Sequence, residues 1–407
     1  FVRRLYSCYF LPMSVLIFLL ILSVLVLVHE LGHYVAARIF GVKAEEFGYG
    51  FPPRAVGFVR VDTLDRDRRV VSKKWKRVSG SDQTAYDNTV WSVNWLPLGG
   101  FVKLKGETGD GTDQKDSFQS KPGWQKFIIL AAGVFMNWLL ASMIFAFGFA
   151  SGVPAELAGL PQNALVSDKR IEITDVVAGS AALEAGLQAG DYVISFNETA
   201  PANAEEARAI LKTYDEKTPV TIKVKRDGEE KSLTATAKYL PELDRAAFGV
   251  GLTDIGTVKF PFFTAIGQGF VTATSYAGAI VAGFGQLISD LFSGGGQAAD
   301  VSGPVGIAII TGQVSERGFW AIMQFTAILS LNLAVINFLP IPALDGGRAL
   351  FVIFEGLRRK KHDPRVEAAI HQVGFIVLLV LILLVTLQDL RKHGSSIWHG
   401  LLGVFGI

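Results

Sequence analysis

The feature that most constrains this chain is a pair of histidines inside an apolar run long enough to cross a bilayer. The run covers residues 13–40, and its first charged residues are Glu30 and Arg38. As a helix it would measure roughly 42 Å, which is enough to span a membrane with a tilt. His29 and His33 would lie one turn apart on the same face, so both imidazoles can bind one metal ion. The sequence therefore predicts a metal site within the membrane.

Glu30 adds a group that a hydrolase needs. It is offset from His29 by about 100° around the helix, close enough to reach a water bound to the same metal. Zinc is the favoured metal, because imidazole suits it and two histidines leave room for a third ligand and a water. The alternative is an accidental H-E-x-x-H sequence with solvated histidines. Ionisable side chains are costly inside a membrane span, so the pattern favours a zinc hydrolase.

Composition indicates a membrane protein with a soluble portion. Of the 407 residues, 50% are hydrophobic and 19% are charged, and the mean hydropathy is +0.36, too apolar for an ordinary soluble protein. The net charge of +2 gives no sign of a nucleic-acid partner. The single cysteine, Cys8, excludes an internal disulfide framework. Residues 1–12 are too short for a separate cleavable signal, so we expect the first run to remain as a span. Because the chain begins at Phe1, we expect its native start to lie upstream.

A long polar segment, residues 41–126, follows the first span and is rich in Lys and Arg. The positive-inside rule predicts that it faces the cytoplasm. Its basic residues, Arg66, Arg68, Arg69, Lys73, Lys74, Lys76 and Arg77, predict a solvated face or contact with anionic lipid. Within it, residues 47–53 interleave aromatics with Gly and Pro, and residues 94–104 end in an alternating stretch typical of a strand. These two pieces form either hairpins that dip into the membrane and line a cavity or interfacial turns, and the sequence favours neither.

The second span is expected at residues 124–150. Gly133 and Asn137 fall on one of its faces, where a small residue allows close approach and an amide can bond across the contact. We therefore expect this face to pack against the first helix.

Two later spans are expected at residues 318–339 and 374–387. The earlier one is stopped by Pro340 and Pro342. The basic loop 358–365 between them indicates a cytoplasmic end. Residues 260–292 are apolar but rich in small residues, and we expect a helix in the membrane interface there rather than a further span. A glycine-rich hinge, residues 294–296, follows it.

The composition of residues 165–240 is that of a soluble domain. The alternating run 220–225 before Asp227 and Gly228 predicts a β-hairpin, and residues 204–213 predict a helix. The segment 173–197 resembles a bacterial PDZ domain, a fold that binds extended peptides by adding a strand to a sheet edge. A β-rich spacer without a ligand is the alternative.

Two histidines do not complete a catalytic zinc site, which usually has three protein ligands and a water. Asp345 is the preferred third ligand, because it follows the proline break and precedes two glycines, so its carboxylate can turn into the bundle. A helix-capping role is the alternative for Asp345, and His371, near the start of the last span, is a competing ligand. The other histidines, in a basic loop or on the far side of the membrane, are His362, His393 and His399.

These features together resemble the site-2 protease family. The resemblance rests on the His29-Glu30-x-x-His33 helix, the run from Asn337 to Gly346, and the PDZ-like domain between them, and it covers nearly all the chain. It is strongest to the bacterial proteases that cleave anti-sigma factors. The resemblance implies that His29, His33 and Asp345 hold Zn²⁺, that Glu30 is the catalytic base, and that substrates are membrane-spanning helices.

The resemblance also implies where a substrate would bind. The positions carried over are Asn332, Asn337, Pro340, Pro342, Gly100, Phe101, Val102 and Lys103. Two departures concern the choice and gating of substrate. Well-known members of this branch carry two tandem PDZ domains where only one is evident here, and residues 59–91 form an enlarged loop.

The expected fold is a polytopic α-helical membrane protein with about four transmembrane helices, an inserted β-rich PDZ-like domain and membrane-dipping β-hairpin elements. The expected regions are a first membrane half (1–150), the PDZ-like domain (165–245), an interfacial helix and linker (246–317) and a second membrane half (318–407). We expect a bacterial inner-membrane location, with the active site near the cytoplasmic side and the PDZ-like domain outside.

The expected function is intramembrane zinc metalloprotease activity on peptide bonds within or next to transmembrane helices. Anti-sigma-factor-like proteins and signal-peptide remnants are the expected substrates; membrane lipids and a peptide or protein ligand of the PDZ-like domain are the expected partners. One alternative is a non-enzymatic PDZ membrane scaffold, which leaves the metal-binding residues unexplained. Another is a zinc transporter, which would need polar groups along a whole pathway and internal repeats.

Overall fold

The computed structural model describes residues 2–64, 70–80, 86–107, 114–161, 163–226, 228–240, 245–293, 302–359 and 364–404. It forms two compact units, one of Phe1–Phe145 with Gly269–Ile407 and the other of Ala146–Gln268. Several sequence predictions lie outside the described residues: those for Arg66, Arg68, Arg69, Asp227, His362 and the hinge 294–296.

Five helices among the described residues are long and apolar enough to cross a membrane. They are Met13–Ile39 within α1 (Val2–Ile39), α2 (Gly123–Ser151), Phe262–Asp290 within α5 (Phe262–Ser293), α7 (Phe319–Phe338) and Arg365–Lys392 within α9 (Pro364–Val404). Four of them match the predicted spans. The fifth, in α5, has a mean hydropathy of 1.3, the lowest of the set. Its interfacial location stays a prediction.

Two shorter helices were not predicted from the sequence. The first, α6 (Pro304–Glu316), packs against α1, α7 and α9. Its N-terminal amides are satisfied by a buried carboxylate of α9, because Asp389 accepts from the backbone N–H groups of Gly303 at 3.2 Å and Gly306 at 2.7 Å. The second, α8 (Asp345–Arg358), begins directly after the proline break.

The polar segment after α1 folds into one sheet in the strand order β2-β1-β3. Its strands are β1 (Ala44–Leu64), β2 (Val70–Val78) and β3 (Val90–Leu104). Both β1 and β3 double back. Residues 46–49 of β1 pair with 100–103 of β3 on one side and with 90–93 on the other, and residues 56–59 of β1 pair with the far side of 90–93. The bends fall near Pro52 and Pro97, so the two hairpin pieces predicted separately are interleaved in one sheet.

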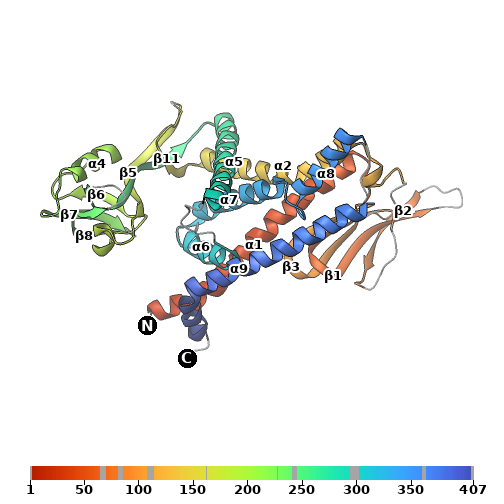
Figure 1. Cartoon of the computed structure of the whole chain (residues 1–407), viewed down its shortest axis with the longest axis horizontal. Coiled ribbons are helices and arrows are strands. Elements are labelled where there is room, and N and C mark those ends of the chain that lie inside the picture. The colour runs from red at the N-terminus through yellow and green to blue at the C-terminus, as the bar shows by residue number, and fades with distance from the viewer. Residues whose placement is uncertain are drawn as a thin grey trace. The chain divides into compact units, whose positions relative to one another are not determined.

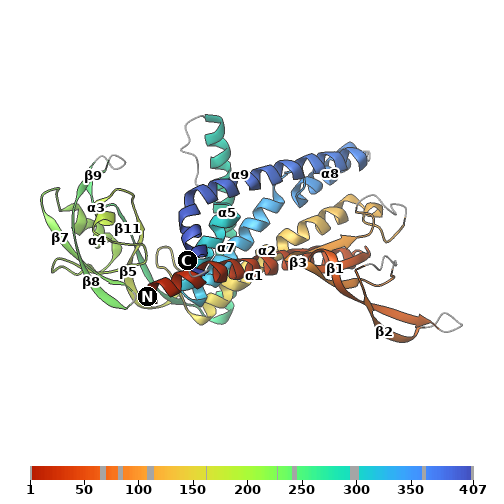
Figure 2. The same ribbon diagram turned by 90° about the horizontal axis from the view of Figure 1, so that it is seen from below.

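The inner part of this sheet lies along α1 (Figures 1 and 2). Ser23 Oγ donates to the carbonyl of Pro97 at 3.2 Å, and Gly99 lies against Val26. Nearer the end of α1, the Tyr34 ring packs against Phe47 and Trp91. Because Ser23 falls mid-way along the apolar segment of α1, the bend of β3 reaches the middle of that helix.

The second unit is a six-stranded sheet in the order β4-β11-β5-β6-β7-β8. Its strands are β4 (Val153–Glu156), β5 (Leu165–Val176), β6 (Tyr192–Phe196), β7 (Pro219–Arg226), β8 (Glu229–Thr236) and β11 (Val250–Lys259). The predicted hairpin is β7–β8, and the predicted helix is α4 (Ala204–Lys212). The sheet also includes β4 and β11, which lie outside residues 165–245.

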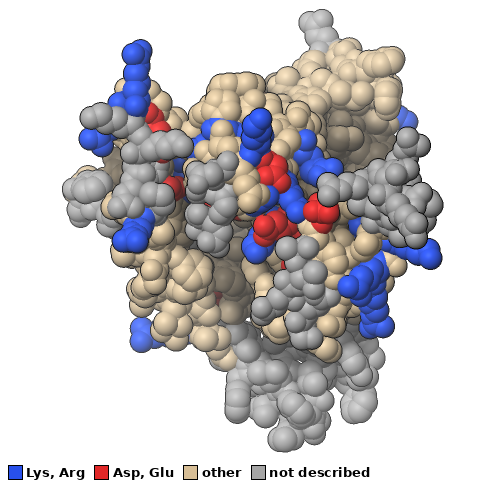
Figure 3. Space-filling model, turned by 90° about the vertical axis from the view of Figure 1, so that its right-hand side faces the viewer, with Lys and Arg blue, Asp and Glu red and all other residues tan. Residues whose placement is uncertain are grey.

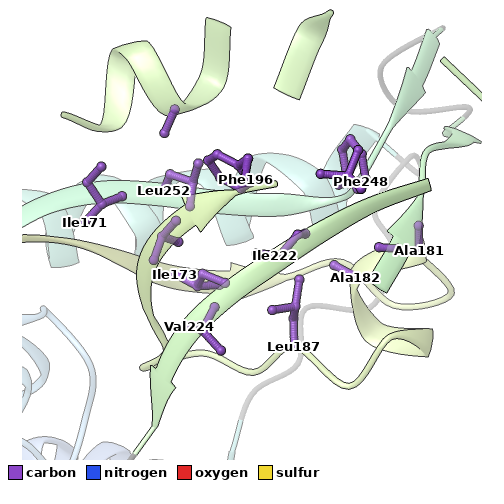
Figure 4. Close-up of a cluster of buried hydrophobic side chains, with 14 of the residues drawn as sticks. Ile171, Ile173, Ala181, Ala182, Leu187, Phe196, Ile222, Val224, Phe248 and Leu252 are labelled. Carbon is purple, nitrogen blue, oxygen red and sulfur yellow. The ribbon is translucent and has the colours of Figure 1, made fainter. Parts of the chain in front are cut away.

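Alternating apolar residues of these strands make the core of the second unit. Side chains from β5, β6, β7 and β11 converge there with Leu187 and Phe248 from the loops (Figure 4). Short elements complete the description: α3 (Ala181–Glu184), the hairpin β9 (Lys238–Leu240) and β10 (Arg245–Ala247), and, in the first unit, the 3-10 helix Phe118–Ser120.

Candidate metal centre

Three metal-binding side chains meet between α1 and the start of α8. His29 Nε2 and Asp345 Oδ2 are 2.8 Å apart, His33 Nε2 and Asp345 Oδ2 are 3.2 Å apart, and the two Nε2 atoms are 3.1 Å apart. Both histidines are buried, and Asp345 is half-buried. Within the described part of the chain, these three side chains form a group whose donor atoms lie close enough together to bind one metal ion.

The loop between α7 and α8 directs Asp345 to the histidines. The helix α7 ends at Phe338, and Ala343 adopts a positive φ of 78° before α8 begins. A Cβ at Gly346 would collide with the carbonyl of Leu339, and one at Gly347 with that of Ile341, so only glycine allows this close return of the chain. The N-cap position of α8 is occupied by Leu344, which makes no side-chain capping bond, and the Asp345 carboxylate is turned to His29 and His33.

His371 has a different role from the one considered in the sequence. Its Nδ1 accepts the backbone N–H of Ala343 at 2.8 Å, and it takes no part in the three-residue cluster. His371 therefore holds the loop that leads to Asp345.

Ion pairs attach α8 to its neighbours. Arg348, one turn after Asp345, pairs with Glu107 beyond the end of β3, and the buried Lys126 of α2 lies 3.5 Å from Glu355. Burial opposes the charge on Arg348, but the Glu107 carboxylate raises the pKa of Arg348 above its ordinary value. These contacts fix the helix whose first residue is Asp345.

The other ring nitrogen of each histidine faces α2. His33 Nδ1 donates to the carbonyl of Ile129 at 2.8 Å. His29 Nδ1 lies 3.4 Å from Nδ2 of the Asn137 side chain, and Asn137 is fully buried. The Asn137 carbonyl in turn accepts from Ser330 Oγ of α7 at 2.8 Å. The contact between Asn137 and His29 confirms the prediction that the Gly133 and Asn137 face of α2 packs against the first helix.

Gly133 allows α2 to approach this closely. A Cβ on Gly133 would collide with His33 Nε2 and lie 2.7 Å from His29 Cε1. Gly32 on α1 is crowded in the same way by the backbone of Ala132. The two helices are thus in contact through glycines at the level of the histidines.

The donor atoms suit a bound cation. Since His33 Nδ1 donates its hydrogen to a carbonyl, the neutral ring keeps a lone pair on Nε2. That lone pair faces another imidazole nitrogen and a carboxylate oxygen, an arrangement that a positive ion at their centre would stabilise. Ligands of a tetrahedral zinc ion with bonds of about 2.0–2.1 Å lie about 3.3 Å apart, close to the separations of 2.8–3.2 Å seen here. The residues therefore fit Zn²⁺.

Glu30 lies between the histidines and the edge of the β-sheet. Its Oε2 accepts the backbone N–H of Val102 at 3.1 Å. Val102 pairs with Phe47 on the other side of β3, so its N–H points away from β1 and towards the helix. The predicted strand 100–104 is thus brought to the predicted catalytic residue.

The remaining predicted site residues are less closely placed. Asn332 Nδ2 donates to Ile328 in its own helix at 3.0 Å, and Asn337 is half-buried near the end of α7. Lys103 forms an ion pair with Glu45 at 2.9 Å. Gly100, Phe101, Pro340 and Pro342 lie on β3 or in the α7–α8 loop. Their roles in substrate binding stay predictions.

The predicted site residues omitted Asn137, Ser330 and the Ile129 carbonyl. The spacing of Gly133 and Asn137 predicted a packing face but did not show that this face would meet a histidine.

Two imidazoles on the membrane-length helix α1 and a carboxylate at the start of the shorter helix α8, with a second carboxylate beside them, define a metal-dependent hydrolase with its site among the helices. The chain belongs to peptidase family M50, the site-2 protease family, whose model matches residues 17–64 and 82–381.

Curated relatives extend over nearly the whole chain. It is 30% identical over 436 residues to the zinc metalloprotease RasP of Geobacillus kaustophilus, covering 93% of this chain and 98% of that protein. It is 28% identical over 434 residues to the regulator of sigma-W protease RasP of Bacillus subtilis, with 93% and 98% coverage. The chain is a multi-pass membrane zinc metalloprotease, and Zn²⁺ is its cofactor. This excludes the scaffold and transporter alternatives.

Proposed function

We propose that this protease hydrolyses peptide bonds within or next to transmembrane helices, with zinc held by His29, His33 and Asp345 and with Glu30 as catalytic base. One observation carries the proposal: the three donor atoms lie within 3.2 Å of one another beside a carboxylate that contacts a strand edge. The site therefore combines a metal centre, a base and a surface for extended backbone.

The residues divide the chemistry between them. A zinc ion bound here supplies a Lewis acid that polarises the scissile carbonyl and makes water more acidic. Glu30 accepts a proton from the attacking water and delivers it to the leaving amine. The hydrogen bond from Val102 holds the Glu30 carboxylate in place for both transfers.

A transmembrane helix must unwind before it can be cut, because its own hydrogen bonds hide the scissile carbonyl. The outer edge of β3 offers an alternative set of partners for the released backbone. This edge follows α1 from Glu30 towards Ser23, so an unwound segment added there would lie next to Glu30. Asn332 and Asn337, with Pro340 and Pro342, would border the segment on its other side.

Membership of the site-2 protease family supports a proposal for the location, orientation and substrates of this protein. We infer a bacterial inner-membrane protease with the metal centre near the cytoplasmic side and the six-stranded unit outside as a PDZ-like domain. That domain would exclude substrates with bulky external parts or bind an exposed peptide end. Anti-sigma-factor-like proteins are the first substrates to test, since the Bacillus subtilis relative is named "regulator of sigma-W protease RasP", and signal-peptide remnants are the second.

The decisive experiment compares the purified protein with Glu30→Gln on a reporter that carries a single transmembrane helix. Gln keeps the size of the side chain and can still contact Val102, but it cannot accept the proton. We expect cleavage to fall at least about a hundredfold, as for loss of a general base, while the zinc content stays near one per chain. Full cleavage by Glu30→Gln at normal zinc content contradicts the proposal.

A further inference from the structure

The outer strands of the first sheet carry aromatic and cationic side chains on one face. Cross-strand pairing joins Phe58 to Trp91 on one side and to Arg77 on the other, and joins Arg60 to Trp75. Alternate residues of a strand share a face, so Lys73 belongs with Trp75. We name this set the aromatic–cationic face: Phe58, Arg60, Lys73, Trp75, Arg77 and Trp91.

The opposite face of the sheet already supplies the core of the hairpin that β1 and β2 form. Val59, Val78 and Val90 are buried there, with Val61 and Tyr86 packed beside them. The aromatic side chains are therefore not needed for that core, and they remain accessible: 63% of Trp75, 46% of Phe58 and 39% of Trp91 is exposed. Grouped exposed aromatics are typical of a surface that contacts another molecule or a membrane.

The aromatic–cationic face lies close to the end of the apolar segment of α1, and therefore near a membrane boundary. The ring centroids of Trp91 and Tyr34 are 5.3 Å apart, and Tyr34 lies five residues before Ile39, where the apolar segment of α1 ends. That separation corresponds to about 7–8 Å along the helix. The hairpin continues outward from Trp91, away from the level of Ser23 and Pro97 (Figures 1 and 2). Trp and Tyr are enriched at this boundary in membrane proteins.

The charge of the face matches one kind of surface. The described side chains of residues 57–61 and 73–78 include Arg60, Lys73, Lys74, Lys76 and Arg77 and no Asp or Glu. The acidic residue Asp62 follows on β1 as the cross-strand partner of Lys73, which leaves Arg60 and Arg77 as the cations beside the aromatics. Viewed from the end where this sheet lies, Lys and Arg appear at several places on the visible surface, and Asp and Glu lie mainly beside basic groups near the centre (Figure 3). Cations beside interfacial aromatics complement anionic headgroups.

We propose that the aromatic–cationic face is a docking surface for anionic phospholipid headgroups of the leaflet at which α1 ends. The aromatic rings lie at the headgroup level, and Arg60 and Arg77 pair with phosphates. Docking holds the outer strands at the membrane surface. The strands β1 and β3 continue from this face to the sheet edge that contacts Glu30. Docking therefore also fixes the depth of that edge in the membrane. The proposal requires only a membrane-embedded chain and none of the assigned catalytic roles.

The test uses the full chain in nanodiscs of phosphatidylcholine with about 30% phosphatidylglycerol. A photoactivatable group on the phosphatidylglycerol headgroup reports contact, and crosslinked peptides are identified by mass spectrometry. The test variant is Lys73→Glu/Arg77→Glu. The matched control is Lys74→Glu/Lys76→Glu, which makes the same charge change on the same strand but on the opposite face.

We expect crosslinks at residues 57–61 and 73–78, with a yield that falls about tenfold in the test variant and stays within twofold in the control. Trp75→Ser, which leaves the charges unchanged, should also lower the yield. Zinc content and thermal stability verify that each variant is folded. Equal losses in the test and control variants, equal yields from a phosphatidylcholine probe, or no crosslinks in these strands would each overturn the proposal. If these strands form no lipid crosslinks but do crosslink to another protein in native membranes, the face is assigned to a protein partner.

Discussion

The backbone N–H of Val102 donates to Glu30 Oε2 at 3.1 Å, and this hydrogen bond joins the edge of the β-sheet to α1 beside the metal-binding histidines. The bond comes from the main chain, so side-chain substitutions at Val102 leave it intact. It places the carboxylate where an extended substrate would lie. The position of the Glu30 carboxylate, the proposed base, thus depends on the sheet as well as on the helix that carries it.

Val102→Pro tests this bond directly. Proline removes the N–H, and because that N–H points away from β1, the ladder between β1 and β3 loses no donor. A hydrogen bond to a charged group contributes about 1.5–3 kcal/mol, so we expect activity to fall about 10- to 100-fold at unchanged zinc content. Val102→Ala, which keeps the N–H, should stay within a few-fold of the parent in the same reporter assay. Equal activity of the two variants would show that the bond does not orient Glu30.

The third ligand can be tested with a pair of variants. Asp345→Ala removes a donor atom of the cluster, whereas His371→Leu removes the acceptor of the Ala343 N–H and the ring contact with Phe351 but no atom of the cluster. We expect metal analysis of the purified proteins to show loss of zinc for Asp345→Ala and nearly full zinc for His371→Leu. His371→Leu should lower the free energy of unfolding by about 1–3 kcal/mol, since it leaves the backbone N–H of the half-buried Ala343 without its acceptor. The opposite zinc contents would move the third ligand to His371.

Gly133→Ala should weaken zinc binding through packing alone. The added methyl group would overlap His33 Nε2 and press on His29 Cε1, in a contact between two helices that cannot easily separate. We expect at least a tenfold weaker zinc affinity, measured by competition with a chelator. Gly278→Ala in α5 is the control, because a Cβ there meets nothing within 4 Å. Normal zinc affinity of Gly133→Ala would mean that α2 does not approach the histidines as described.

Asn137 should set the orientation of His29. The amide nitrogen of Asn137 lies nearest His29 Nδ1, and the amide oxygen is buried without a partner among the described residues. Turning the amide over lets this oxygen accept the Nδ1 hydrogen of His29, and Nε2 then keeps its lone pair for the metal. Partners of this kind typically change metal affinity by about 10- to 100-fold. We expect Asn137→Leu to weaken zinc binding by that amount, and Asn137→Asp, which retains an acceptor, to recover much of it. Chelator competition measures both variants, and cobalt spectra report the ligand geometry. A Leu variant with parental affinity and spectrum would reduce Asn137 to a packing residue.

Local regularities made several parts of this protein predictable. The spacing of His29 and His33 depends only on the helical repeat, and four of the membrane-length helices follow from uninterrupted apolar runs. The β7–β8 hairpin follows from alternation around a short turn signal. In each case, residues close in the sequence determine the outcome, because a backbone with a fixed period places them on a common face.

The completed site required the tertiary structure. Asp345 lies 316 residues from His29, and the choice between it and His371 depended on a loop with a positive φ and on which group accepts the Ala343 N–H. The interleaving of β1 and β3, the bond from Val102 to Glu30 and the contact of Asn137 with His29 all join distant segments. No local period encodes such contacts, since they form only when the helices and the sheet pack together. The sequence by itself determined the two histidines and their helix, whereas the packing of α1 against α2, α8 and β3 decided what surrounds them.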